Sequence, residues 1–134
     1  MLANITSGCI KGIEGFVVSV EVDISAGLPT FTLVGLPDQE VKEAKDRVLA
    51  AVRNSGFDVP LKKITINLVP AEIKKGGTHF DLPIVLGILA ASEQLSAHAL
   101  EKLKDIVFIG ELGRNGKVHS CAGVLPMLIS LKKL

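Results

Sequence analysis

The sequence contains no tryptophan and no tyrosine, and five phenylalanines are its only aromatic residues. Its core must therefore be mainly aliphatic, and a platform of several exposed rings for stacking nucleic-acid bases is excluded. A membrane-spanning helix needs about 20 apolar residues. The longest apolar run, from Leu82 to Ala91, is shorter and contains Pro83 and Gly87. Because no secretory signal is present either, we expect a chain that neither crosses nor binds a membrane.

The sequence also has few cysteines and almost no excess of charge of one sign. Cys9 and Cys121 lie far apart and form no C-x-x-C pair, which is typical of free thiols in a reducing cytoplasm. Fifteen basic and fourteen acidic side chains leave a formal charge of +1, so no overall field attracts nucleic acid or anionic lipid. The balanced total charge does not exclude a local basic patch. The 134 residues, 48% of them hydrophobic, predict one globular domain.

Hydrophobic periodicity predicts a mixture of strands and helices. Apolar and polar residues alternate from Phe16 to Ile24, as in a half-buried strand. Apolar residues at helical spacing run from Val41 to Val52. The order of elements predicts a two-layer α/β sandwich with a mixed β-sheet. Strands are expected over residues 3–11, 16–24, 30–34, 62–68 and 106–109 (the last one buried), helices over 38–54, 82–94, 97–104 and 124–134, and a tight Asn-Gly hairpin turn over 112–117.

Polar residues at the starts of three helices are interpreted as caps. Asp38, Asp81 and Ser96 each stand where a side-chain oxygen could accept a hydrogen bond from the first turn. The charged side chains of the first helix, among them Lys45 and Arg47, are interpreted as a solvated outer face.

The most suggestive segment for chemistry is the loop from Ala71 to Phe80, in which two lysines and two glycines precede a helix. Glycines let backbone N–H groups approach an anion, and a helix N-terminus adds partial positive charge. The pattern suggests a phosphate or small-ligand site, although a surface loop with two solvated lysines is the interpretation we favour. No P-loop or dinucleotide-binding glycine motif occurs in the chain. The candidate ligand-binding residues are Lys74, Lys75, Gly76, Gly77 and His79.

Metal and acid–base sites have little support in the sequence. His79, His98 and His119 do not follow a metal-ligand spacing, and Cys121 beside His119 lacks a second pair. We therefore predict no metal site. Asp81 is interpreted as a helix cap, not as a general base.

Six short motifs are specific in combination and span nearly the whole chain. They are Leu33-Val-Gly-Leu-Pro-Asp38, Val41-Lys-Glu-Ala-Lys-Asp-Arg-Val48, Asn54-Ser-Gly56, Ile64-Thr-Ile-Asn-Leu-Val-Pro-Ala71, Phe80-Asp-Leu-Pro83 and Ile109-Gly-Glu-Leu112. Together they resemble the amino-terminal domain of the ComM/YifB family of magnesium-chelatase-like AAA+ ATPases. The resemblance implies the fold shared by the Lon proteolytic domain and domain 2 of a ribosomal small-subunit protein. It also implies that residues 1–134 form a single Lon-like domain, cut off before the AAA+ module.

The resemblance provides a test for peptidase activity. Active Lon-type domains carry a nucleophilic serine before the helix expected at 82–94, where alignment places His79, and a lysine where Leu125 stands. No serine occurs from Ala71 to Ala91. The resemblance therefore implies an inactive peptidase without catalytic residues. His79 also replaces an arginine expected in the family, and its imidazole is mostly uncharged at neutral pH.

The function implied by the resemblance is non-catalytic. The domain is expected to help assemble a ring-forming motor for DNA branch migration and natural transformation, through self-association and possible contact with DNA. It is expected to need no cofactor itself, since ATP and Mg²⁺ belong to the AAA+ module. The alternative is binding of a small ligand or nucleotide phosphate at the loop from Lys74 to Phe80.

Overall fold

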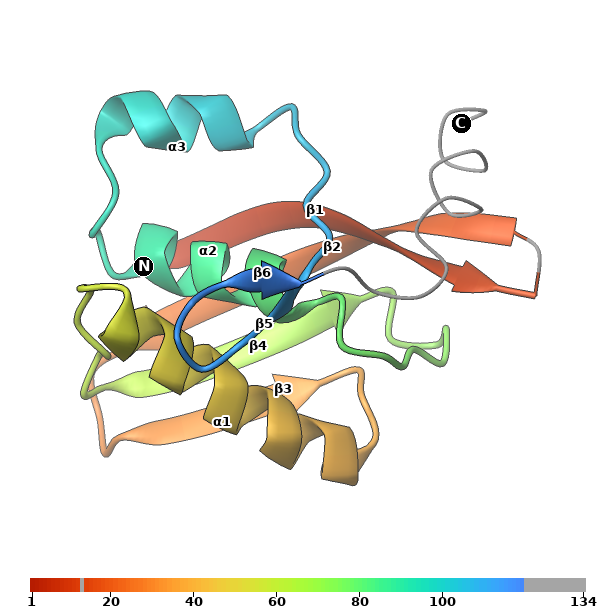
Figure 1. Ribbon diagram of the computed structural model, residues 1–134, viewed down its shortest axis with the longest axis horizontal. Coiled ribbons are helices and arrows are strands. Elements are labelled where there is room, and N and C mark those ends of the chain that lie inside the picture. The colour runs from red at the N-terminus through yellow and green to blue at the C-terminus, as the bar shows by residue number, and fades with distance from the viewer. Residues whose placement is uncertain (13, 120–134) are drawn as a thin grey trace.

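The computed structural model describes residues 1–12 and 14–119, which form a mixed α/β fold. Helices α1 and α2 lie over one face of a four-stranded sheet with the order β1-β2-β4-β3 (Figure 1). β2 pairs antiparallel with β1 and β4, and β3 pairs parallel with β4, so the predicted mixed sheet is confirmed. The strands are β1 (Leu2–Lys11), β2 (Glu14–Ser25), β3 (Thr30–Val34), β4 (Lys63–Val69), β5 (Glu111–Leu112) and β6 (Val118–His119), and the helices are α1 (Asp38–Asn54), α2 (Asp81–Ala91) and α3 (Ala97–Leu103).

The alternation of β2 decides which face of the sheet the helices cover. Val18, Val20 and Val22 are fully buried, whereas Val17 and Asp23 on the opposite face are exposed. Alternate side chains of a strand point to opposite faces, so one face of the sheet joins the aliphatic core. Strands β1 and β2 form an antiparallel hairpin with ten paired positions.

Helix α2 packs closely on the sheet because it carries Gly87. A Cβ atom at that position would lie 2.5 Å from Cγ2 of Val22 on β2. The glycine that interrupts the longest apolar run therefore permits close contact between helix and strand. Helix α1 contributes Ala44, Val48 and Val52 to the buried side, as its apolar stripe predicted.

Three details differ from the sequence prediction. Pro37 and Phe80 occupy the N-cap positions of α1 and α2, so the capping roles predicted for Asp38 and Asp81 are wrong. Helix α2 ends at Ala91, three residues before the expected end at Gln94, since the chain turns there and Glu93 adopts a positive φ of 62°. By contrast, Ser96 does cap α3 and accepts a hydrogen bond from the amide of Ala99 at 3.1 Å.

The segment 106–109 is not the buried strand that its apolar residues predicted. It runs beside β1 through one parallel bridge between Thr6 and Val107, and the amide of Phe108 donates to the carbonyl of Thr6 at 2.9 Å. Ile106 and Val107 are exposed, because the segment lies at the edge of the sheet.

The predicted hairpin turn is confirmed between β5 and β6. The amide of Gly113 donates to the carbonyl of Lys117 at 2.9 Å, and Gly116 adopts a φ of +88°, which favours glycine. The helix expected over residues 124–134 lies outside the described residues. No helix in residues 1–12 and 14–119 has the length and apolar character required to cross a bilayer.

Candidate functional site at the loop before helix α2

Asp81, the first residue of α2, joins three parts of the fold. Its carboxylate accepts two hydrogen bonds from Arg47 of α1, from Nε at 2.7 Å and from Nη2 at 3.0 Å. It also accepts the amide of Leu112 on β5 at 3.1 Å. Asp81 is only 1% exposed. Its role is therefore to hold α1, α2 and the hairpin of β5 and β6 together.

The electrostatics of this junction reflect burial and pairing. Burial raises the pKa of Asp81 above its ordinary value, and the hydrogen bonds from Arg47 and from the Leu112 amide counteract part of that rise. The hydrogen bond to Asp81 in turn raises the pKa of the Arg47 guanidinium. Arg47 therefore stays charged, and one side chain of the charged face of α1 points inward instead of into solvent.

Lys75 is a buried cation within the candidate loop. Only 4% of the residue is exposed, and Nζ donates to the carbonyl oxygens of Pro70 and, at 2.9 Å, of Ile73. Its ammonium group thus closes the loop on itself. Lys74, its neighbour, is exposed. The interpretation of two solvated lysines holds for Lys74 and is wrong for Lys75.

The glycine pair of the loop faces a carboxylate of the same chain. The amide of Gly77 donates to Oε1 of Glu40 on α1 at 2.8 Å. Both carboxylate oxygens of Glu40 lie 3.6 Å from the position that a Cβ of Gly76 would occupy. Backbone N–H groups of a glycine-rich loop attract anions. Here the carboxylate of Glu40 takes the place that an anionic ligand would occupy at these two glycines.

His79 is buried and faces β1. Its Nε2 lies 2.9 Å from the carbonyl oxygen of Gly8, so the neutral tautomer with a proton on Nε2 donates there. Burial lowers the pKa of His79 below its ordinary value, against the Gly8 hydrogen bond and the charge of Asp81, which both raise it. The imidazole is therefore neutral near pH 7, in agreement with the expectation from the sequence. The centroid of its ring also lies 4.1 Å from the centroid of the Phe80 ring.

A cavity of about 440 Å³ opens beside the loop. Of the five candidate residues, Lys74 and Lys75 line it, together with residues 35–37 before α1 and residues 71–73. Gly76 and Gly77 instead lie against Glu40, and His79 lies against β1. The structure therefore divides the candidate site into an open part around Lys74 and a closed part that the protein itself occupies. Among residues 1–12 and 14–119, no three histidine, cysteine, aspartate or glutamate side chains come together as metal ligands.

The sequence prediction missed two contacts at this site, that of Glu40 with the loop and that of Arg47 with Asp81. A signal for them exists, because both align at helical spacing with Ala44 and Ala51, which are buried. A charged side chain in line with a buried stripe indicates a partner across the helix interface. The sequence alone gives no indication of which residue that partner is.

Comparison with known proteins gives consistent matches. Residues 20–134 match the family described as "Subunit ChlI of Mg-chelatase". The chain is 46% identical over 132 residues to Competence protein ComM of Haemophilus influenzae, covering 98% of the chain and 25% of that protein. It is 49% identical over 114 residues to the protein YifB of Escherichia coli, covering 85% of the chain and 22% of that protein. The chain thus spans about a quarter of the length of these relatives.

Proposed function

The chain belongs to the ChlI family of Mg-chelatase subunits, in its ComM/YifB branch, and on this premise we propose that it is a non-catalytic assembly domain of a larger AAA+ ATPase. In this proposal the domain has the Lon-like fold without peptidase activity. ATP hydrolysis, with Mg²⁺, belongs to the remainder of the protein. The whole protein acts in the cytoplasm as a ring-shaped motor on branched DNA, in a process related to competence.

The state of His79 is the observation that carries this proposal. It stands where the resemblance to Lon-type domains places the nucleophile, and it is buried with Nε2 against the Gly8 carbonyl. The buried amine of Lys75 donates to two carbonyl oxygens and not to a hydroxyl group. Covalent catalysis needs a nucleophile within reach of its base. Among the described residues, the hydrogen bonds of His79 and Lys75 go to backbone carbonyl oxygens and not to a hydroxyl or thiol group. Leu125, expected at the position of the base, lies outside the described residues.

A deletion of residues 1–134 from the full-length protein tests the assembly role. We expect the deleted protein to lose self-association in sedimentation velocity, and with it the stimulation of ATPase activity by forked DNA. Equal assembly and equal stimulation with and without these residues would contradict the proposal. Cleavage of unfolded casein by the purified 134-residue chain would contradict its non-catalytic character.

Contact with DNA has a separate signature. If the domain contacts the phosphate backbone, the affinity of the full-length protein for forked DNA should fall steeply as salt rises, because bound cations are released. Deletion of residues 1–134 should make that dependence shallower. An unchanged dependence on salt would assign all DNA contacts to the rest of the protein.

A second candidate function is anion binding in the cavity beside Lys74. The exposed side chain of Lys74 and the volume of about 440 Å³ favour it, whereas Lys75 and the amide of Gly77 are already engaged. Inorganic phosphate or ATP should raise the melting temperature, and Lys74→Ala should abolish that rise. Lys63→Ala, which changes an exposed lysine on β4, is the matched control. No rise in the unmodified protein would exclude this function.

A further inference from the structure

Strand β3 forms an open edge of the sheet. Among residues 1–12 and 14–119 it pairs only with β4, and the four-stranded sheet ends there (Figure 1). The amide of Thr30 donates to the carbonyl of Lys62, which sets the register between the two strands. Because backbone groups of successive residues in a strand point to opposite sides, those of Phe31 and Leu33 point away from the sheet. Within the part of the chain that the structure describes, no other strand pairs with these groups.

The usual protections of an edge strand are absent from β3. Such strands normally carry a charged residue, a proline or a bulge that prevents pairing with another chain. Strand β3 reads Thr-Phe-Thr-Leu-Val over residues 30–34, with no charged residue and no proline, and its five residues pair continuously with β4. The edge is therefore competent to accept a strand.

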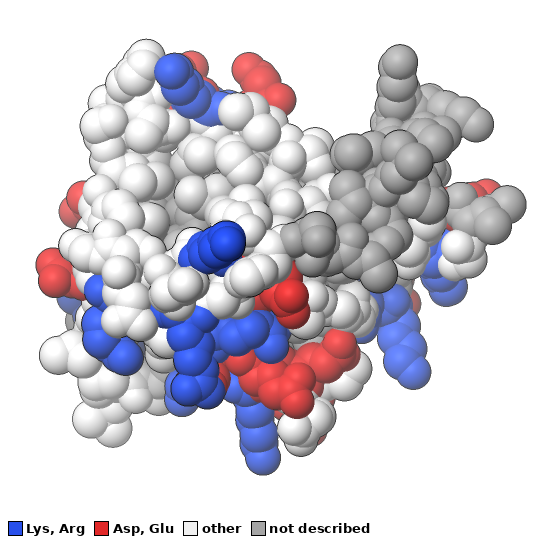
Figure 2. All heavy atoms as spheres, in the orientation of Figure 1, with Lys and Arg blue, Asp and Glu red and all other residues white. Residues whose placement is uncertain are grey.

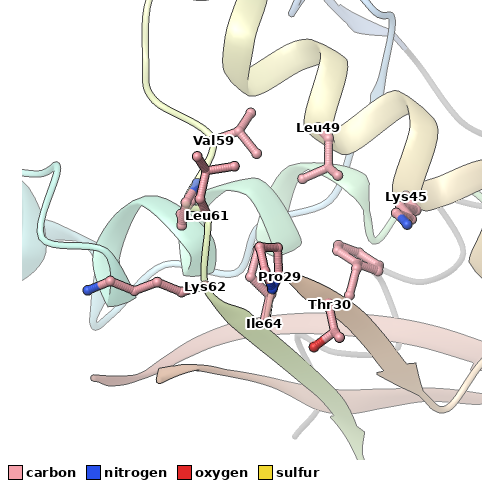
Figure 3. Close-up of a pocket in the computed structure, with 10 residues that line it drawn as sticks. Pro29, Thr30, Lys45, Leu49, Val59, Leu61, Lys62 and Ile64 are labelled. Atoms are coloured by element: carbon pink, nitrogen blue, oxygen red, sulfur yellow. The ribbon is translucent and has the colours of Figure 1, made fainter. Parts of the chain in front are cut away.

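An apolar pocket lies at the start of this strand, between β3, α1 and the segment before β4. It has a volume of about 180 Å³, and Figure 3 shows its walls: Pro29 and Thr30 at the start of β3, Leu49 on α1, and Leu61 in the segment before β4. Ligand sites for small molecules usually occupy about 300–1,000 Å³, so this pocket suits a single side chain. Two leucines at its end of the molecule are strongly exposed, Leu28 at 84% and Leu61 at 80%.

The charges around the pocket are basic. Lys45 and Lys62 are the charged residues in its wall. A neighbouring hollow on the same helix adds Lys42 and Arg53, together with Asp46, which is paired with Arg114. In Figure 2, acidic side chains gather over the start of α1 and basic side chains over the rest of the helix. The surface therefore complements a negatively charged occupant.

We propose that the β3 edge and this pocket form a docking site for an extended, acidic segment of a partner protein. The segment adds a strand to β3 through the backbone of Phe31 and Leu33, and it places one apolar side chain between Leu49 and Leu61. Lys45 and Lys62 contact its acidic residues. In this mode the backbone hydrogen bonds supply affinity, and the pocket supplies specificity.

A second copy of the chain is a poorer occupant than an acidic segment. The other edge of the sheet exposes Ile106 and Val107, but the residues before them, Lys104 and Asp105, carry opposite charges. The exposed acid nearby, Glu101, is paired with Lys104 at 3.0 Å. That edge therefore offers no net negative charge to Lys45 and Lys62.

A labelled peptide with the sequence Glu-Val-Thr-Leu-Thr-Val-Glu tests the site by fluorescence polarisation on the full-length protein. We expect saturable binding, a loss of about tenfold with Leu61→Asp, and protection of the Phe31 and Leu33 amides from hydrogen exchange. The double variant Lys45→Glu/Lys62→Glu should reverse the preference, so that a peptide with lysines in place of the glutamates binds better. Leu2→Asp, an exposed leucine on β1, is the matched control and should change nothing.

Three results would overturn the proposal. The first is the absence of saturable binding up to about 1 mM peptide. The second is equal affinity for the acidic and the lysine peptide in the unmodified protein. The third is concentration-dependent self-association that Leu61→Asp abolishes while peptide binding is lacking, which would assign the edge to a second copy.

Discussion

The loop before α2 and the edge at β3 are opposite in character, although both lie beside α1. In the loop, the polar groups are largely satisfied by the protein itself: Lys75 by two carbonyls, Gly77 by Glu40, and His79 by Gly8. At the β3 edge, the backbone of Phe31 and the side chain of Leu61 face outward. The region rich in chemically suggestive residues is thus mostly closed, and the plain apolar edge is open.

This difference shows why residue type alone is a poor guide to binding. A buried polar group must be paired within the fold, since an unpaired one costs about 1–3 kcal/mol. Pairing removes it from the groups available to a ligand. An edge strand has the opposite property, because its outward backbone groups stay free unless another chain covers them. The predictions that follow run from the largest expected effect to the smallest.

Removal of the buried carboxylate should have the largest effect on stability. Asp81→Ala leaves Arg47 and the Leu112 amide without their partner, and breaking a buried ion pair costs about 3–5 kcal/mol. Urea unfolding followed by circular dichroism measures the loss. Arg114→Ala, which breaks the exposed pair with Asp46, should cost less than about 1 kcal/mol. Similar losses in both variants would show that the junction is not a stabilising element.

The two lysines of the loop should differ in their effect on the free energy of unfolding, because Lys75 is buried and Lys74 is exposed. Lys75→Met removes the donor to Pro70 and Ile73, and it should lower the free energy of unfolding by about 1–3 kcal/mol. Lys74→Ala, at the exposed neighbour, should stay within about 0.5 kcal/mol. The two variants can be compared by thermal unfolding. Equal effects would remove the distinction drawn between these lysines.

The buried imidazole should make the fold sensitive to mild acid. Because the pKa of His79 is lowered in the folded state, the unfolded chain takes up the proton first, near the ordinary value of 6.5. Its contribution to stability is complete above that pH and is lost as the pH falls below it. Asp81, with a raised pKa, acts in the opposite direction.

The variant His79→Gln isolates this contribution, since glutamine can still donate to the Gly8 carbonyl. Urea unfolding between about pH 7.5 and 5.5 should show a steeper loss of stability in the unmodified protein than in the variant. Parallel curves would mean that His79 is free to take up a proton in the folded state.

The smallest effect on stability is expected at the open edge. Leu61→Ser should change the free energy of unfolding by no more than about 0.5 kcal/mol, because the side chain is 80% exposed. The same variant should weaken binding of the acidic peptide. A large loss of stability would show that Leu61 belongs to the core and not to a docking surface.

The elements with a clear period were predicted well from the sequence. The alternation in β2 and the stripe of α1 depend on local geometry, so burial of Val20 or Val48 follows from spacing alone. The Asn-Gly turn and the cap at Ser96 are also local, and both are confirmed. Segment 106–109 was placed wrongly, since an apolar run does not reveal whether it lies in the centre or at the edge of a sheet.

The residues of the candidate site show the limit of such reasoning. Asp81 has the sequence context of a helix cap, but its carboxylate meets an arginine 34 positions earlier in the chain. Glu40 meets Gly77 across 37 positions. Hydrogen bonds between distant segments depend on how helices and loops pack, and that packing leaves no periodic signal in the sequence.

The sequence by itself determined the class of fold, most of the strands and helices, and membership in the ComM/YifB branch, because spacing and short motifs are local properties of the chain. Only the tertiary structure decided which charged groups are paired within the fold and which edge of the sheet is open. Burial and pairing at Lys75, His79 and Asp81 arise when distant segments meet, and so does the exposure of β3 at the end of the sheet.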